Sequence, residues 1–209
     1  MNPLSELVLS EGWPRLGIWL AGAIVLALLD CELPAFISLV VAGILTWMYR
    51  KPVRSTVHFE PGALTSPCDG RVSRVQTKDS GENIIEIETG CLDASVLCSP
   101  FEAEVSEVKV VRGARLRRKS PLWTLLNEHG SVQFQSSEGH AVHVTHKLSR
   151  ESAPLCVDLV QNRAHVLRGT QYGVMTSGTT HISLPASVRI AVNPGEKVRA
   201  VETLLGYLG

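Results

Sequence analysis

The stretch that decides the fold reads Ile84-Ile85-Glu86-Ile87-Glu88, where apolar and charged side chains alternate. A period of two puts successive side chains on opposite faces of a strand, so a half-buried β-strand is expected. The same period recurs in Arg71-Val72-Ser73-Arg74-Val75 and in Val105-Ser106-Glu107-Val108-Lys109-Val110. Glycine-containing turn signals separate such runs along the chain. The pattern predicts a mainly β domain, a compact β-sandwich or barrel-sandwich-like structure.

Two apolar runs precede this domain, Trp13 to Leu29 and Leu33 to Tyr49. As a helix, each run of about 17 residues extends about 25 Å, the short end of what crosses a bilayer of about 30 Å. An N-terminal transmembrane helical hairpin is therefore predicted, with two tilted spans and a re-entrant hairpin both left open. The expected organisation is an N-terminal cytoplasmic segment (1–12), a double hydrophobic membrane anchor (13–54) and the β domain (55–209).

Basic residues flank the apolar pair, with Arg15 near its start and Arg50, Lys51 and Arg54 after it. The positive-inside rule then places both ends in the cytoplasm. The expected location is the inner (cytoplasmic) membrane, with the β domain facing the cytoplasm. The alternative, a buried hairpin of a soluble protein, is disfavoured because neither run has a polar face for water.

Charge and cysteine usage exclude several classes of protein. Twenty Lys and Arg balance twenty Asp and Glu, so nucleic acid is not an expected partner. The five cysteines include no Cys-x-x-Cys pair, which argues against a disulfide framework and a zinc site. His143 and His146 have the spacing of a metal pair but no third ligand nearby, so no metal is expected.

Four segments carry a family resemblance through their order and spacing. They are Glu11-Gly12-Trp13-Pro14 opening the apolar pair that ends in Tyr49-Arg50-Lys51-Pro52, then Ser66-Pro67-Cys68-Asp69-Gly70-Arg71-Val72, Leu92-Asp93-Ala94-Ser95-Val96-Leu97-Cys98-Ser99-Pro100 and Arg168-Gly169-Thr170-Gln171-Tyr172-Gly173-Val174-Met175-Thr176-Ser177-Gly178-Thr179. Together they resemble the short, archaeal-type branch of the phosphatidylserine decarboxylases over nearly the whole chain. Such enzymes cut themselves before a serine, which becomes a pyruvoyl group. That group is the electron sink when phosphatidylserine loses carbon dioxide.

The resemblance implies catalytic roles for Asp69, Gly178 and Thr179. Asp69 matches the family aspartate, Gly178 the glycine before the cut, and Thr179 the processed serine. Attack by the Thr179 hydroxyl on Gly178 would leave a 2-oxobutanoyl group, a pyruvoyl-type cofactor. Two other positions depart from the family, because Ala94 falls where its histidine is expected and Cys98 where its arginine is expected. The usual base is missing, and candidates to replace it are His140, His143, His146 and His181.

Three functions remain open on this reading. The first is a membrane-anchored decarboxylase of phosphatidylserine, or a related aminophospholipid, in phosphatidylethanolamine synthesis. The second is a non-catalytic pseudoenzyme that binds lipid headgroups or regulates a membrane enzyme. The third is a membrane-tethered adaptor, disfavoured because heptads are missing. Homo-oligomerisation stays open. A basic cluster that fits either anionic headgroups or a solvated loop comprises Arg112, Arg115, Arg117, Arg118 and Lys119.

Overall fold

The computed structural model divides the chain into two compact units, residues 1–53 and 54–209. It describes residues 9, 12–52, 54, 57, 59–78, 81–117, 119–149, 155–157 and 161–209. Arg118, a member of the basic cluster described above, lies outside the described ranges.

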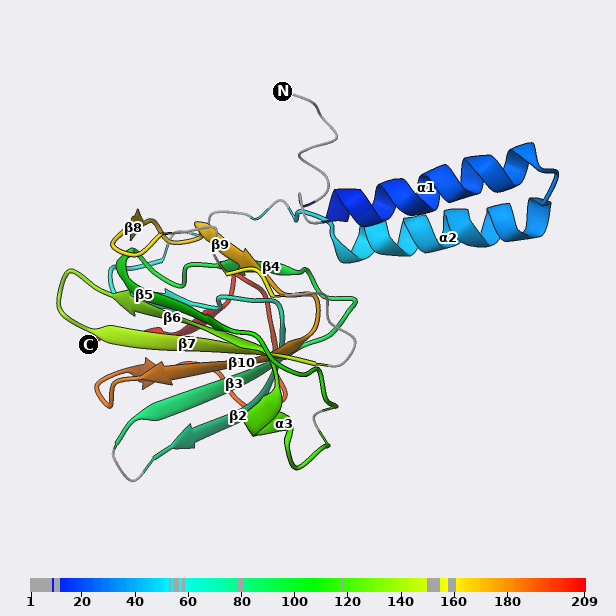
Figure 1. Ribbon diagram of the computed structural model, residues 1–209. Helices are drawn as coiled ribbons and strands as arrows, with labels where there is room; N and C mark the ends of the chain where they lie inside the picture. Colours follow the sequence, from blue (N-terminus) through cyan, green and yellow to red (C-terminus); the bar gives the residue numbers. More distant parts are fainter. Residues whose placement is uncertain are drawn as a thin grey trace. The chain divides into compact units, whose positions relative to one another are not determined.

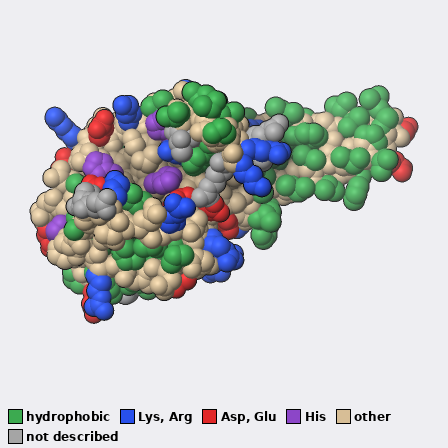
Figure 2. All heavy atoms as spheres, turned by 90° about the horizontal axis from the view of Figure 1, so that it is seen from below, with side chains coloured by type: hydrophobic (Ala, Val, Ile, Leu, Met, Phe, Trp, Pro, Cys, Tyr) green, Lys and Arg blue, Asp and Glu red, His purple; other side chains and the backbone are tan. Residues whose placement is uncertain are grey.

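The first unit is a helical hairpin of α1 (Trp13–Leu28) and α2 (Glu32–Met48). Pro14 stands in the first turn of α1, where its missing N–H costs no helical hydrogen bond. The Arg15 guanidinium donates a hydrogen bond to the Tyr49 hydroxyl, which ties the start of α1 to the end of α2. Hydrophobic side chains cover the visible surface of the hairpin (Figure 2). Large apolar residues are exposed along both helices, among them Ile18, Ile24, Leu28, Leu33, Phe36, Leu39 and Trp47.

The prediction of membrane-spanning helices is wrong in this form. The two helices contain 16 and 17 residues, and in the described part of the chain no helix is long and apolar enough to cross a membrane. The physical reason is length, because at about 1.5 Å per residue the two helices extend about 24 and 26 Å, less than a hydrocarbon core of about 30 Å. Asp30, with a left-handed φ of 55°, lies in the turn between them.

The second unit is built on one large antiparallel sheet with the strand order β12-β2-β3-β10-β7-β6-β5-β8 (Figure 1). Its strands are β2 (Gly70–Thr77), β3 (Asn83–Thr89), β5 (Ala103–Val111), β6 (His129–Gln135), β7 (Ala141–Leu148), β8 (His165–Val166), β10 (Gly178–Leu184) and β12 (Lys197–Val198). Two small sheets accompany it, formed by β1 (Ala63–Thr65), β13 (Leu204–Tyr207) and β11 (Arg189–Ile190), and by β4 (Val96–Cys98) and β9 (Gln171–Val174). A single short helix, α3 (Trp123–Leu126), lies between β5 and β6 in the described part of this unit.

Side-chain alternation explains why these segments form strands. In β3, Ile85 and Ile87 are buried while Glu88 between β2 and β10 is exposed. The inward positions of the large sheet form one hydrophobic core with residues of the small sheets. Phe134 and Tyr172 meet edge to face in it, with ring centroids 5.3 Å apart. The mainly β prediction is confirmed, as a large antiparallel sheet with two small ones.

Candidate functional site

Asp69 stands directly before β2 and is held by charge and hydrogen bonds. Arg54 Nη2 lies 2.6 Å from both carboxylate oxygens, and the Ala200 amide donates to Oδ1 over 2.8 Å. The Asp69 carbonyl accepts a 2.7 Å hydrogen bond from the Thr89 hydroxyl. The next residue must be glycine, because a Cβ on Gly70 would collide with the Glu88 carbonyl. Asp69 is therefore more than a turn residue, since its carboxylate is the anion of an ion pair.

Gly178 opens β10 in a crowded position. It pairs with Thr89 of β3 on one side and with Leu148 of β7 on the other. A Cβ here would collide with the Lys147 carbonyl and come within 2.8 Å of Met175 Sδ. Because Thr89 also bonds the backbone of Asp69, the predicted aspartate and the predicted cut site lie at the same end of the sheet.

Thr179 is almost fully buried, with 3% of its surface exposed. Its cross-strand partners are Glu88 on β3 and Lys147 on β7, and such pairs share a face of an antiparallel sheet. The Lys147 ammonium lies 5.5 Å from the centre of the Trp123 ring, so α3 reaches the neighbourhood of Thr179. Neither cross-strand partner of Thr179 carries an imidazole.

His146 lies on the opposite face and bonds the next threonine. Its Nδ1 is 2.8 Å from Thr180 Oγ1, and its Nε2 is 2.7 Å from the Tyr172 hydroxyl. Burial lowers the pKa of His146 to about 3, with a smaller contribution from His181, so the ring is neutral in the folded protein at physiological pH. Of the candidate bases, His146 is thus committed to Thr180 and not to Thr179.

Cys68 extends the same buried network. Its thiol donates to Thr180 Oγ1 over 3.4 Å, and burial raises its pKa to about 11, so it is protonated. Burial likewise raises the pKa of Tyr172 well above its usual value. The network of Cys68, Thr180, His146 and Tyr172 was missed from the sequence. Strand alternation gave one usable signal, since it places His146 among the inward apolar residues of β7.

The third family segment supplies no base either. Ala94 is buried, as is Cys98 at the arginine position. Counted without a gap from Asp93 to Pro100, the histidine of the family pattern falls on Ser95, one residue beyond Ala94. Burial raises the pKa of the Cys98 thiol to about 12, although nearby Arg54 lowers it. The thiol is protonated at neutral pH, so it is not a ready base.

The remaining candidate histidines are spread along the sheet. His143 is exposed on β7 and pairs with Ser183, several residues from the cut site along β10. His140 precedes β7 at the other end of that strand. His181 shares the face of Thr179 because it lies two residues further along β10. The predicted opposition of His143 and His146 is confirmed by their exposure and burial.

A family model of phosphatidylserine decarboxylase matches residues 41–206. The chain belongs to the phosphatidylserine decarboxylase family. A phosphatidylserine decarboxylase proenzyme of Symbiobacterium thermophilum is 27% identical over 212 residues, covering 97% of this chain and 96% of the relative. One of Burkholderia vietnamiensis is 29% identical over 224 residues, covering 100% and 99%. No solved structure matches the chain. The family resemblance of the four segments is confirmed.

The family's pyruvoyl group, implied by relatives described as proenzymes, does not fit the residues present here. Thr179 stands where the resemblance places the serine, and the nearest buried imidazole, His146, bonds the neighbouring hydroxyl. Asp69, which would orient a base, is paired with Arg54 instead. The chain therefore keeps the framework of the family, while none of the described residues that bond the Asp69 carboxylate or pair with Thr179 carries an imidazole.

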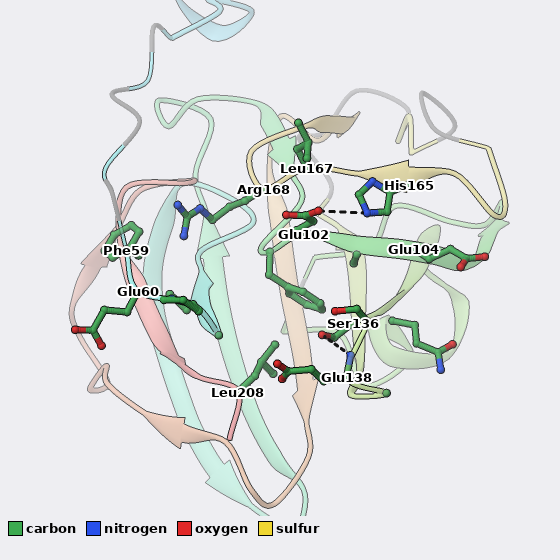
Figure 3. Close-up of a pocket in the computed structure, with 18 of the residues that line it drawn as sticks. Phe59, Glu60, Glu102, Glu104, Ser136, Glu138, His165, Leu167, Arg168 and Leu208 are labelled. Atoms are coloured by element: carbon green, nitrogen blue, oxygen red, sulfur yellow. Dashed lines mark hydrogen bonds and ion pairs between the residues drawn. The ribbon is translucent and has the colours of Figure 1, made fainter.

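A cavity of about 1030 Å³ extends from the β6–β7 connection, at the end of the sheet opposite to Gly178, to Val201, which follows the Ala200 that bonds Asp69 (Figure 3). It contains neither Asp69 nor Thr179, and its lining includes the β6–β7 connection, about 23 Å from Gly178 along β7. The residues of this acidic cavity that Figure 3 labels are Phe59, Glu60, Glu102, Glu104, Ser136, Glu138, His165, Leu167, Arg168 and Leu208. Glu102 and His165 approach to 3.4 Å, and Arg168 lies over the Phe59 ring, so its charges are partly paired within the cavity.

Proposed function

We propose that this protein is a non-catalytic member of the family that binds phosphatidylserine-type phospholipid at the membrane and remains one uncut chain. The observation that carries the proposal is the pairing of Arg54 with both oxygens of Asp69. An arginine cannot take up a proton from a hydroxyl, because its guanidinium is already protonated in a protein. The ion pair thus takes the place that an aspartate–histidine pair would need for self-cleavage.

The hairpin is the proposed means of membrane association. Its large apolar side chains are exposed around both helices, and in water this surface would be unfavourable by about 25 cal/mol per Å². Aromatic Trp13 and Trp47 stand near its open end with Arg15 and Arg50, a combination suited to the headgroup region. We place the hairpin in the cytoplasmic leaflet of the inner membrane without crossing it, and the β unit in the cytoplasm.

A second candidate function is decarboxylation itself, favoured by the retained Gly178 and the hydroxyl of Thr179. In that case the chain would cut itself at Gly178–Thr179, and Thr179 would become a 2-oxobutanoyl group. Full-length similarity to relatives described as proenzymes supports this candidate. It requires a base in place of the missing histidine, and among the described histidines His181 lies two residues along β10 on the face of Thr179.

The test measures lipid binding and product formation in one sample. Full-length protein is mixed with phosphatidylcholine vesicles that contain phosphatidylserine, and both co-flotation and phosphatidylethanolamine are measured. The proenzyme of Geobacter metallireducens, 27% identical, is the positive control for turnover. Binding without product is expected. Product at a rate near that of the control would establish the second candidate, and absence of binding would rule out the first.

A further inference from the structure

The segment between β5 and β6 displays leucines beside a run of basic residues. Residues 112–126 include five Arg or Lys and no Asp or Glu. Leu125 is 76% exposed, and Leu122 and Leu126 are each 49% exposed. Arg117 and Lys119 are exposed in the same segment. Large apolar side chains grouped at a protein surface are a sign of an interaction site.

Hydrogen bonds and an ion pair from the β unit hold the segment that carries these leucines. Asn127, itself buried, bonds the amide and the carbonyl of Leu116 and also the Leu148 carbonyl, over 2.8–3.0 Å. Buried Glu128 pairs with Arg112 and accepts a hydrogen bond from the Leu155 amide. Two buried polar residues therefore hold both ends of the segment against the sheet.

Trp123 anchors the middle of the segment. It is 6% exposed, and the Lys147 ammonium lies 5.5 Å from its ring centre. Because the tryptophan points inward on the one short turn of α3, its neighbours Leu122 and Leu125 are turned outward. This arrangement presents Leu122 and Leu125 at the surface of the β unit, beside the buried Trp123.

We propose that residues 112–126 form a docking surface for an anionic lipid bilayer. The leucines enter the boundary between headgroups and acyl chains, while Arg117 and Lys119 contact lipid phosphates. The inference rests on the proposed function, because it names the surface and the lipid class through which the β unit meets the membrane. Lys147 is the cross-strand partner of Thr179, so docking brings the Thr179 end of the sheet to the lipid surface.

Charge and shape favour a bilayer over other partners. A nucleic-acid surface would be expected to offer exposed aromatic rings for stacking, whereas the tryptophan of this segment is buried. The segment combines positive charge with protruding aliphatic side chains, which suits an anionic interface. At about 1 kcal/mol per basic residue near such a surface, Arg117 and Lys119 together favour binding roughly thirtyfold at low salt.

The test compares Leu125→Asp with Leu167→Asp in the full chain. Leu167 is a matched control because it is 61% exposed and lines the acidic cavity. Both variants should keep the melting temperature of the wild type, since neither side chain is buried. Binding to vesicles with phosphatidylserine should fall at least about fivefold for Leu125→Asp and stay within about twofold for Leu167→Asp.

Hydrogen exchange of the amides in 122–126 distinguishes membrane binding through this surface from binding through the hairpin. Vesicles with phosphatidylserine or phosphatidylglycerol should slow their exchange equally, and added salt should reverse the effect. Wild-type binding with unchanged exchange in this segment would overturn the inference and leave the proposed function standing. Slowing by phosphatidylserine alone would also overturn it, in favour of a headgroup-specific site. Failure of the wild type to bind any vesicle would overturn the proposed function as well.

Discussion

His146 Nδ1 lies 2.8 Å from Thr180 Oγ1, on the face of β10 opposite to the Thr179 side chain. Neighbouring residues of a strand point to opposite faces. The only buried histidine described in the β unit therefore bonds Thr180 and not Thr179. With Tyr172 on its other nitrogen, this imidazole is a core residue whose hydrogen bonds are filled. The missing base of the site is therefore not recovered through His146.

His146 should make the stability of the protein depend on pH. Its pKa is about 3 in the folded chain against an ordinary value of 6.5, so between these values the unfolded chain binds more protons. The free energy of unfolding should therefore fall by about 1.4 kcal/mol per pH unit as pH drops below 6, with no contribution above pH 7. Urea unfolding between pH 5 and 7 measures this slope. His146→Asn should remove it, and an unchanged slope would contradict the assignment.

Arg54 and Asp69 should be strongly coupled in stability. Arg54→Met leaves a largely buried carboxylate without its cation and should lower the free energy of unfolding by about 2 kcal/mol. Adding Asp69→Asn should recover about 1 kcal/mol, because the amide still accepts from Ala200. Urea denaturation of the wild type, Arg54→Met, Asp69→Asn and the double variant gives the coupling free energy between the two residues. Arg199→Met is the control, since its side chain is 64% exposed and its pair with Glu202 spans 3.6 Å. If the effects of Arg54→Met and Asp69→Asn on the free energy of unfolding were additive, the two side chains would not interact.

Gly178 should be required for packing whether or not the chain is cut. Gly178→Ala places a methyl group against the Lys147 carbonyl and Met175, so a loss of about 2–3 kcal/mol in unfolding free energy is expected. Gly90→Ala is the matched control, because its nearest neighbour, Asp93 Oδ2, would be 3.4 Å away. Equal losses in thermal unfolding of the two variants would show that close contact at Gly178 is not the cause.

Asn127 should control the docking segment without touching lipid. Asn127→Ala removes three hydrogen bonds that hold Leu116 and Leu148, so amide exchange in 112–126 should quicken about tenfold. The response of these amides to anionic vesicles should weaken with it. Asn162→Ala is the control, as it removes an exposed hydrogen bond to the Val108 amide. If the amides of 112–126 exchange at the same rate in both variants, Asn127 does not hold the segment.

Local alternation was enough to predict the strands β2, β3 and β5 and the opposite faces of His143 and His146. Ile85, Ile87 and His146 point inward as the period of two requires. The neighbours of Thr179 were beyond such a pattern, because the order of strands brings Glu88 and Lys147 together from distant parts of the chain. The alternation could not show that Arg54 would bind Asp69.

The hairpin and the third family segment show two further limits of prediction from the sequence. Apolar composition indicated the two helices and their ends to within one residue, but not whether helices of this length cross a membrane. In the third segment, Ala94 was compared with the family histidine although an ungapped count selects Ser95. A motif that has diverged keeps few identical residues, so its alignment with the family pattern is poorly defined. In the docking segment the sequence shows the basic residues, whereas the exposure of Leu125 is a property of the folded chain.

The central claim is that the chain stays uncut, and the intact mass of the purified full-length protein tests it most directly. Wild type and Thr179→Ala are solubilised in detergent and measured side by side. A single species near 22.7 kDa is expected for both proteins, differing only by the substitution. A wild-type break at Gly178–Thr179, releasing residues 179–209 with an N-terminal carbonyl and absent from Thr179→Ala, would contradict it and establish a threonine-derived lyase.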